Sequence, residues 1–177
     1  YTNHPQGLEA GLEATHYYDP PNLTFPFGSY ICVVDIDPKT YAINIRRFIA
    51  IDDCGNIINP MIVEGQIHGG LTQGLAPAMF EELIYDEDGN ILNGTLMDYL
   101  VPTAVETPNW ETDQTVTPSP HHPLGAKGVA ESPTVGAPPA IANAVIDALS
   151  HLGVESMGIP ITPFKVWQVL KDKGLAA

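Results

Sequence analysis

The sequence predicts an α+β fold, in which a β-hairpin comes first and helices pack on one side of it. Two observations support this class. Residues 31–36 are rich in β-branched side chains, and after the turn sequence DPKT, residues 43–51 alternate apolar with polar positions, which is typical of paired strands. Further along the chain, apolar residues recur three or four positions apart, which is the spacing of helices packed on a core.

A first long helix is predicted to begin after Asn59, which suits the N-cap position, with Pro60 in the first turn. Apolar residues then recur at roughly helical spacing from Ile62 to Leu83, before the turn sequence DEDGN. Each glycine in a helix costs about 1 kcal/mol relative to alanine. We therefore expect another backbone or a ligand to approach this helix closely. Its glycines are Gly65, Gly69, Gly70 and Gly74.

Two more helices are predicted near the carboxyl end. Residues 134–153 hold the proline pair of the sequence APPA in the first turns, with Gly153 as the stop. Residues 161–174 form the third helix, capped by Thr162 with Pro163 at its first position. Prolines exclude a long helix near the amino end. The remaining segments are predicted as an extended arm over 1–27, short strands and loops over 91–116, and a loop over 118–128.

The charge balance excludes some function classes. Seven lysines and arginines face 21 acidic residues, for a formal net charge of −14. Nucleic acids and anionic membrane surfaces require a cationic contact surface, so we expect neither as a partner. No stretch reaches the roughly 18 consecutive apolar residues of a membrane span. We see no signal peptide and expect a cytoplasmic location, although a first residue of Tyr1 leads us to expect a piece of a longer or processed chain.

Glu131 is the first candidate for chemistry. It stands between the glycine-containing approach GAKGVA and the predicted second helix. Two interpretations remain open. The carboxylate could cap the helix, whose amino end has unpaired N–H groups and partial positive charge. Alternatively, it could act as a general base in a loop whose glycines let a bulky group come close.

The start of the first helix, EGQIHGGLTQG, is the second candidate. Glutamine amides donate and accept hydrogen bonds in fixed geometry, which suits a cofactor site. The other interpretation is a tight helix–helix contact through small residues, with Gln66 and Gln73 exposed to solvent. The segment is not a phosphate-binding loop, because neither GxxxxGK[ST] nor GxGxxG is present.

Metal and nucleophile motifs are weak. Asp52, Asp53, Cys54 and His68 are near in sequence, but they lack the CxxC or HxxxH spacing of zinc sites, and the His121–His122 pair is typical of a loop. No GxSxG motif occurs. The two cysteines, Cys32 and Cys54, form no disulfide framework and are expected to be buried thiols.

Three segments together carry a resemblance. They are LEATHYYDPPNLTFPFGSYICVVDIDP, DDCGNIINPMIVEGQIHGGLTQGLAPAMFEEL and HPLGAKGVAESPTVGAPPAIANAVIDAL. In this order they resemble the carboxy-terminal part of molybdenum hydroxylase large subunits, the xanthine dehydrogenase and aldehyde oxidase family. Within it, the carbon monoxide dehydrogenase large chains look nearest. The resemblance implies that residues 1–177 form the carboxy-terminal portion of a molybdenum cofactor-binding domain, as one unit or as two α+β subdomains.

The resemblance also implies site residues. The family's glutamate that faces the molybdenum falls on Glu131, where it accepts a proton while the substrate carbon is attacked. The helix glutamine that hydrogen-bonds beside the molybdenum falls on Gln66. The main chain of Lys127, Gly128 and Val129 is expected to run past the pterin.

The implied cofactor is molybdenum on molybdopterin cytosine dinucleotide. The implied partners are the remainder of the large subunit, an iron–sulfur small subunit with [2Fe-2S] clusters, a medium subunit with FAD, and a small-molecule substrate. Two departures matter. Ala130 stands where many relatives have glycine, and neither Cys32 nor Cys54 matches the copper-binding cysteine of carbon monoxide dehydrogenases. Three alternatives stay open: a relative that oxidises aldehydes or nitrogen heterocycles, a non-catalytic assembly subunit or remnant, and a small-molecule binding module.

Overall fold

The sheet consists of a hairpin and one strand added parallel to it. The computed structural model describes residues 5–7 and 11–176. In it, β1 (Phe27–Ile36) pairs antiparallel with β2 (Ile43–Asp53), and β3 (Trp110–Thr115) pairs parallel with β2, in the order β1-β2-β3. The predicted hairpin is confirmed. The parallel pairing of β3 needs a long crossover, which the chain between β2 and β3 provides.

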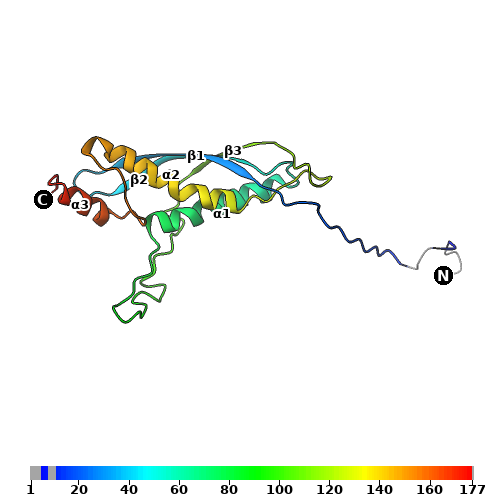
Figure 1. Ribbon diagram of the computed structural model, residues 1–177, viewed down its shortest axis with the longest axis horizontal. Coiled ribbons are helices and arrows are strands. Elements are labelled where there is room, and N and C mark those ends of the chain that lie inside the picture. Colours follow the sequence, from blue (N-terminus) through cyan, green and yellow to red (C-terminus); the bar gives the residue numbers. More distant parts are fainter. Residues whose placement is uncertain (1–4, 8–10, 177) are drawn as a thin grey trace.

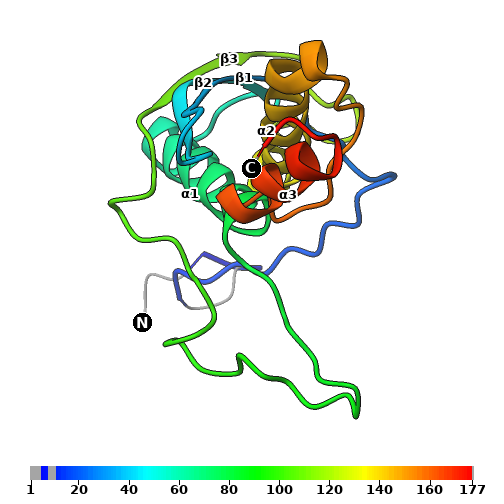
Figure 2. The same ribbon diagram turned by 90° about the vertical axis from the view of Figure 1, so that its left-hand side faces the viewer.

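The helices form a second layer on one face of this sheet. Figure 2 shows α1 (Pro60–Met79) and α2 (Glu131–Leu149) side by side beneath the strands, with α3 (Pro163–Asp172) at one end. The predicted α+β class, with helices on one side, is confirmed. Two buried clusters hold the layers together. The first comprises Phe48, Ala50, Ile67, Leu71, Leu75, Ala78, Ala137 and Ile141, and the second Val145, Leu149, Val154, Ile161, Val166 and Leu170.

α1 begins as predicted and ends earlier. The Asn59 side-chain oxygen accepts a hydrogen bond from the Ile62 amide at 3.3 Å, which confirms the N-cap. The prediction that the helix reaches Leu83 is wrong, because it stops at Met79. A continuing helix would need the Ala78 carbonyl for its next turn, but that oxygen accepts the Ile161 amide at 2.7 Å.

α2 begins three residues before its predicted start. Glu131 is the first helical residue and not a loop residue, so the proline pair lies inside the helix instead of in its first turns. This earlier start is possible because Pro133 occupies the first turn, where a backbone N–H has no partner within the helix. The helix passes into a short 3₁₀ turn (Ser150–Leu152), and Gly153, with φ of 74°, ends it as predicted.

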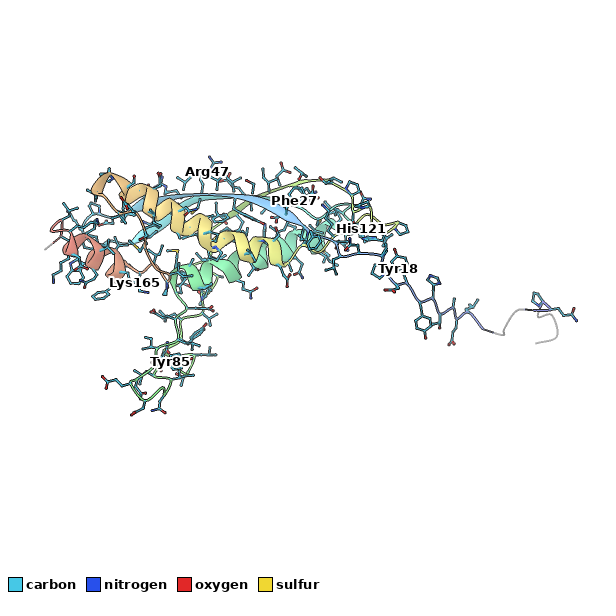
Figure 3. The ribbon with its side chains drawn as sticks, in the orientation of Figure 1. Tyr18, Phe27, Arg47, Tyr85, His121 and Lys165 are labelled. Atoms are coloured by element: carbon cyan, nitrogen blue, oxygen red, sulfur yellow. The ribbon has the colours of Figure 1, made fainter. Side chains whose placement is uncertain are left out.

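The remaining predictions hold where the structure describes them. Thr162 caps α3 by accepting the Lys165 amide at 3.2 Å. Residues 11–26 form an exposed arm without helix or strand, which extends away from the two layers (Figure 1), while residues 1–4 and 8–10 of the predicted arm lie outside the described residues. Residues 81–109 project in another direction, and Figure 3 shows Tyr85 on this excursion, far from the helices. Within residues 5–7 and 11–176, no helix is long and apolar enough to cross a membrane.

Candidate active site

Glu131 opens α2 with an exposed side chain. It lies on a cleft of about 470 Å³ whose other walls are mainly apolar, with Phe27, Tyr30, Val135 and Pro139 among them. Within the described part of the chain, no hydrogen bond or ion pair engages the Glu131 carboxylate. The capping interpretation therefore has no hydrogen bond to support it. The partial positive charge at the amino end of α2 stabilises the ionised carboxylate, but no amide group of the helix is bonded to it. The carboxylate is available to an incoming group.

The backbone before Glu131 is ordinary. Ala130 has φ of −63° and ψ of −37°, which are helical values that any residue adopts. A glycine at this position is therefore not required for a positive φ. The Ala130 carbonyl also accepts a hydrogen bond from the Thr134 hydroxyl at 3.1 Å, which ties the first turn of α2 to its own cap.

Lys127 is directed into the protein. Its ammonium group lies 3.1 Å from Asp53 Oδ1, with the two side chains 7% and 0% exposed, and 4.7 Å from the centre of the Phe27 ring. The Gly55 amide and the Thr115 hydroxyl also donate to Asp53, at 2.9 Å and 3.0 Å. Burial alone would raise the pKa of Asp53, but hydrogen bonds from Gly55, Thr117 and Lys127 outweigh it and hold that pKa well below its usual range.

Of the three residues expected beside a pterin, one presents open backbone. The Lys127 amide donates to the Cys54 carbonyl at 2.7 Å, and Val129 packs against the first core cluster. Gly128 is exposed, and a methyl group added there would meet nothing within 4 Å. The geometry therefore leaves Gly128 as the residue of this segment with room for a ligand against its main chain.

The glycines of α1 divide into two pairs. A side chain at Gly70 or Gly74 would overlap α2, with atoms of Pro133 and Ala137 closer than 3.0 Å, so close helix packing explains these two. A side chain at Gly65 or Gly69 would meet nothing within 4 Å. Helix packing therefore accounts for Gly70 and Gly74, and the interpretation as a ligand site stays open for Gly65 and Gly69.

Gln66 lies on the open side of α1. Its side chain is exposed, and it sits one turn before Gly70, whose neighbours are Ala130 and Pro133 at the start of α2. The fold thus brings the turn that carries Gln66 and the turn that carries Glu131 to the same end of the helix pair. An exposed amide and an exposed carboxylate therefore lie toward that end, whereas Gly69 borders a separate hollow with Thr72 and Trp110.

The residues considered as weak metal candidates are buried or engaged in contacts within the fold. Asp52, Asp53 and Cys54 are buried at the end of β2. His68 approaches the Thr112 hydroxyl at 3.5 Å, and His122 Nε2 lies 2.7 Å from the Ala126 carbonyl oxygen. No group of three or more histidine, cysteine, aspartate or glutamate side chains among residues 5–7 and 11–176 is arranged to hold a metal ion.

The sequence singled out neither Tyr30 nor Ser132, and it offered Asp52 only as a weak metal candidate. Their oxygen atoms meet beneath the first turn of α2, from β1, β2 and α2 respectively. The available signal was an acidic pair, Asp52–Asp53, directly after an apolar strand. This pair indicated the end of a strand. It did not show which partner each of the two carboxylates contacts.

Comparison with known proteins identifies the family. Residues 3–108 match the molybdopterin cofactor-binding domain family. The chain belongs to this family. Gln66 falls within the match, whereas Glu131 and residues 127–129 follow it.

Longer relatives match nearly the whole chain, including the residues after 108. The carbon monoxide dehydrogenase large chain of Hydrogenophaga pseudoflava is 62% identical over 99% of this chain and 22% of its own length. A crystal structure of a Cu,Mo-CO dehydrogenase in the carbon monoxide-reduced state superposes with a TM-score of 0.93 and 56% identity, over 100% of this chain and 22% of that one. Quinoline 2-oxidoreductase from Pseudomonas putida 86 follows, with a TM-score of 0.88 and 45% identity over 97% of this chain and 22% of that one.

These comparisons confirm the predicted resemblance to molybdenum hydroxylase large subunits. This member of the molybdopterin cofactor-binding domain family spans about a fifth of the length of the relatives that it matches.

Proposed function

We propose that this chain supplies one wall of the active site of a molybdenum-dependent oxidoreductase, with Glu131 as its general base. The observation that carries the proposal is the exposed Glu131 carboxylate, which no described residue engages, on a cleft whose other walls include Phe27 and Val135. A purely structural carboxylate at this place would be expected to accept hydrogen bonds from the helix end. Membership of the molybdopterin cofactor-binding domain family supports the same conclusion.

The chain's own residues fit such a cofactor. Gly65, Gly69 and Gly128 leave space that a Cβ atom would begin to fill, and Gln66 offers an exposed amide. We propose that these residues border the cofactor, in its cytosine dinucleotide form, and that Lys127 and Val129 contribute by holding the segment that carries Gly128. When bound, the cofactor accepts the two electrons that leave the substrate. The part of Glu131 is to face the metal and take up the proton released there.

The complete enzyme is proposed as an assembly. The rest of the large subunit would complete the site, and electrons would leave through [2Fe-2S] clusters on a small subunit to FAD on a medium subunit. We propose a small-molecule substrate oxidised at carbon with oxygen from water, in the cytoplasm. The names of relatives point to two chemical classes, carbon monoxide and nitrogen heterocycles such as quinoline. Aldehydes form the third candidate class. Residues 1–177 are proposed as the carboxy-terminal portion of the cofactor-binding domain.

Replacement of Glu131 tests the proposal. In the full-length large subunit, purified with the chains that assemble on it, Glu131→Gln keeps the size and most of the polarity of the side chain but removes its basicity. We expect molybdenum content to remain at the wild-type level in elemental mass spectrometry, while turnover falls by about 10² to 10⁴, the range for losing a general base. A test panel of carbon monoxide, aldehydes and heterocycles supplies the substrate.

The control is Glu155→Gln, an exposed carboxylate beyond the far end of α2 and outside the proposed site. It should leave turnover unchanged. Normal turnover of Glu131→Gln at full molybdenum occupancy would refute the general-base role. Absence of molybdenum from the wild-type assembly would instead favour the assembly subunit or remnant.

A further inference from the structure

Three polar side chains from separate elements meet directly under the first turn of α2. Ser132 Oγ lies 2.7 Å from Asp52 Oδ1 and 2.7 Å from the Tyr30 hydroxyl oxygen. The Tyr30 hydroxyl also donates to Asp52 Oδ1. Asp52 is 2% exposed, so the contact is almost free of competing solvent. Ser132 thereby donates its one proton to Asp52 on β2, and its oxygen lies in contact with the Tyr30 hydroxyl on β1.

The surrounding backbone leaves room for this arrangement. A Cβ atom at Gly28 on β1 would come closer than 3.0 Å to the Tyr30 ring and to Asp52, and one at Gly136 on α2 would come closer than 3.0 Å to the same ring. Two glycines from different elements are therefore required for the ring to lie flat between sheet and helix. The position of the Tyr30 hydroxyl is set by packing on both sides.

The tyrosine keeps its proton in this setting. Burial and the hydrogen bond to Asp52 raise the pKa of Tyr30 far above its usual value, so the phenol remains a donor at any physiological pH. Asp52 Oδ2, by contrast, is buried with no partner among the described residues. A buried carboxyl oxygen without a partner costs free energy. The unpaired oxygen therefore offsets part of what the cluster contributes to the stability of the fold. A role in fixing the position of the amino end of α2 explains the arrangement better.

The helix end needs such a device. Ala130 at the N-cap position has no side chain that can accept a hydrogen bond from the first turn. The first turn of α2 therefore lacks a side-chain cap for its free amide groups, and Ser132 is the next residue after Glu131. A tether at Ser132 fixes the helix rotation, and with it the direction in which Glu131 leaves the backbone.

We propose that Tyr30, Asp52 and Ser132 are positioning residues that hold the first turn of α2, and so Glu131, in the orientation that proton transfer requires. The inference rests on the proposed function of Glu131. A displacement of about 1 Å at a catalytic group can lower a rate by on the order of 10². The effect on turnover is therefore expected to exceed the effect on substrate binding.

The test uses the assembled enzyme with the full-length subunit. Ser132→Ala and Tyr30→Phe each remove one hydroxyl, whereas Ser132→Thr retains it. We expect kcat to fall by about 10- to 100-fold in the first two variants, with KM within about twofold and molybdenum content unchanged. Ser132→Thr should recover most of kcat. Independently of activity, hydrogen exchange measured by mass spectrometry should show faster exchange in a peptide covering residues 131–137 of Ser132→Ala.

A matched control is Thr162→Ala, which removes another hydroxyl hydrogen bond at the start of a helix, α3, at the far end of α2. It should speed exchange in α3 and leave kcat unchanged. Unchanged kcat and unchanged exchange in Ser132→Ala would overturn the proposal. Faster exchange with normal kcat would also overturn it, because the turn would then be loose without consequence. If Glu131→Gln remains fully active, the proposed function fails instead, and the exchange data still report whether the tether exists.

Discussion

Lys127 is buried, although lysine ordinarily keeps its ammonium group in water. Its partner Asp53 is fully covered and also accepts hydrogen bonds from the Gly55 amide and the Thr115 hydroxyl, so the ion pair joins the end of β2 to the segment that leads to Gly128. Removing one member of a buried pair typically costs about 3 to 5 kcal/mol, because the other charge is left uncompensated. At the residue scale, Lys127 thus acts on the candidate site through the position of its neighbour.

The pair also predicts a pH dependence. The folded-state pKa of Asp53 lies below its unfolded value of about 3.9. Its ionised form therefore stabilises the fold above that value, and this contribution is lost as the pH falls further toward the folded-state pKa. We expect hydrogen-exchange protection of a peptide covering residues 50–57 to decline below about pH 4 in the assembled enzyme. Asp53→Asn should show lower protection at pH 7 and a flatter decline.

The control for this prediction is Asp35→Asn. Asp35 forms an exposed pair with Arg46, whose loss should change protection little because exposed pairs contribute at most about 1 kcal/mol. Equal acid sensitivity of wild-type and Asp53→Asn proteins would show that other carboxylates, not Asp53, govern the acid response of this edge.

At the scale of elements, local signals predicted helix starts better than helix ends. Asn59 and Thr162 act as caps because a side-chain oxygen next to an unpaired N–H is a local arrangement that the sequence displays. The end of α1 at Met79 depends on Ile161, more than eighty residues away, whose amide takes the carbonyl of Ala78. No local pattern contains that contact, and the pairing of β3 with β2 is non-local in the same way.

The candidate site shows the same division. A glycine-rich helix and an isolated glutamate are visible in the sequence, and the family resemblance assigned them roles. The contact of Ser132 with Tyr30 and Asp52 joins residues 102 and 80 positions apart, and only the fold brings them together. The sequence could not distinguish the glycines that pack on α2 from those that face open space, because all four share one helix.

That distinction predicts opposite effects of two alanine substitutions in α1. Gly70→Ala should push α1 and α2 apart and cost about 1 to 3 kcal/mol, because its Cβ would overlap Pro133 and the Ala130 carbonyl. Gly65→Ala meets no atom of the described chain and should stabilise the helix by about 0.5 to 1 kcal/mol. Hydrogen exchange of α1 in the assembled enzyme measures both.

The same pair tests the proposed cofactor position. If a cofactor occupies the space above Gly65, the added methyl group should lower molybdenum content even though the helix becomes more stable. Gly70→Ala should lower stability first, with any loss of molybdenum following from it. Full molybdenum content in a stabilised Gly65→Ala enzyme would remove Gly65 from the set of residues that border the cofactor.

At the scale of the whole molecule, the exposed apolar surface is large for a chain of this size. On the outer face of the sheet, Ile31 is 57% exposed and Val33 43%. The excursion over residues 81–109 exposes Leu96 and Met97 by 84% and 88%. Exposed apolar side chains gathered in this way, here in two separate regions, are typical of protein interfaces. Since the chain spans 22% of its relatives' length, the remainder of the large subunit is the proposed partner.

Limited proteolysis tests this assignment. Residues 81–109 contain leucine, methionine and tyrosine side chains, which chymotrypsin-like proteases accept, on a segment without helix or named strand. In the isolated chain of 177 residues, this excursion and the exposed arm over residues 11–26 should be cut first, and no substrate-dependent dye reduction should be detectable. In the assembled enzyme the same segment should resist cleavage, because proteolysis requires an exposed backbone that can open locally. Rapid cutting between residues 81 and 109 of an active assembly would show that the excursion stays exposed there, and that its apolar side chains face something other than the rest of the subunit.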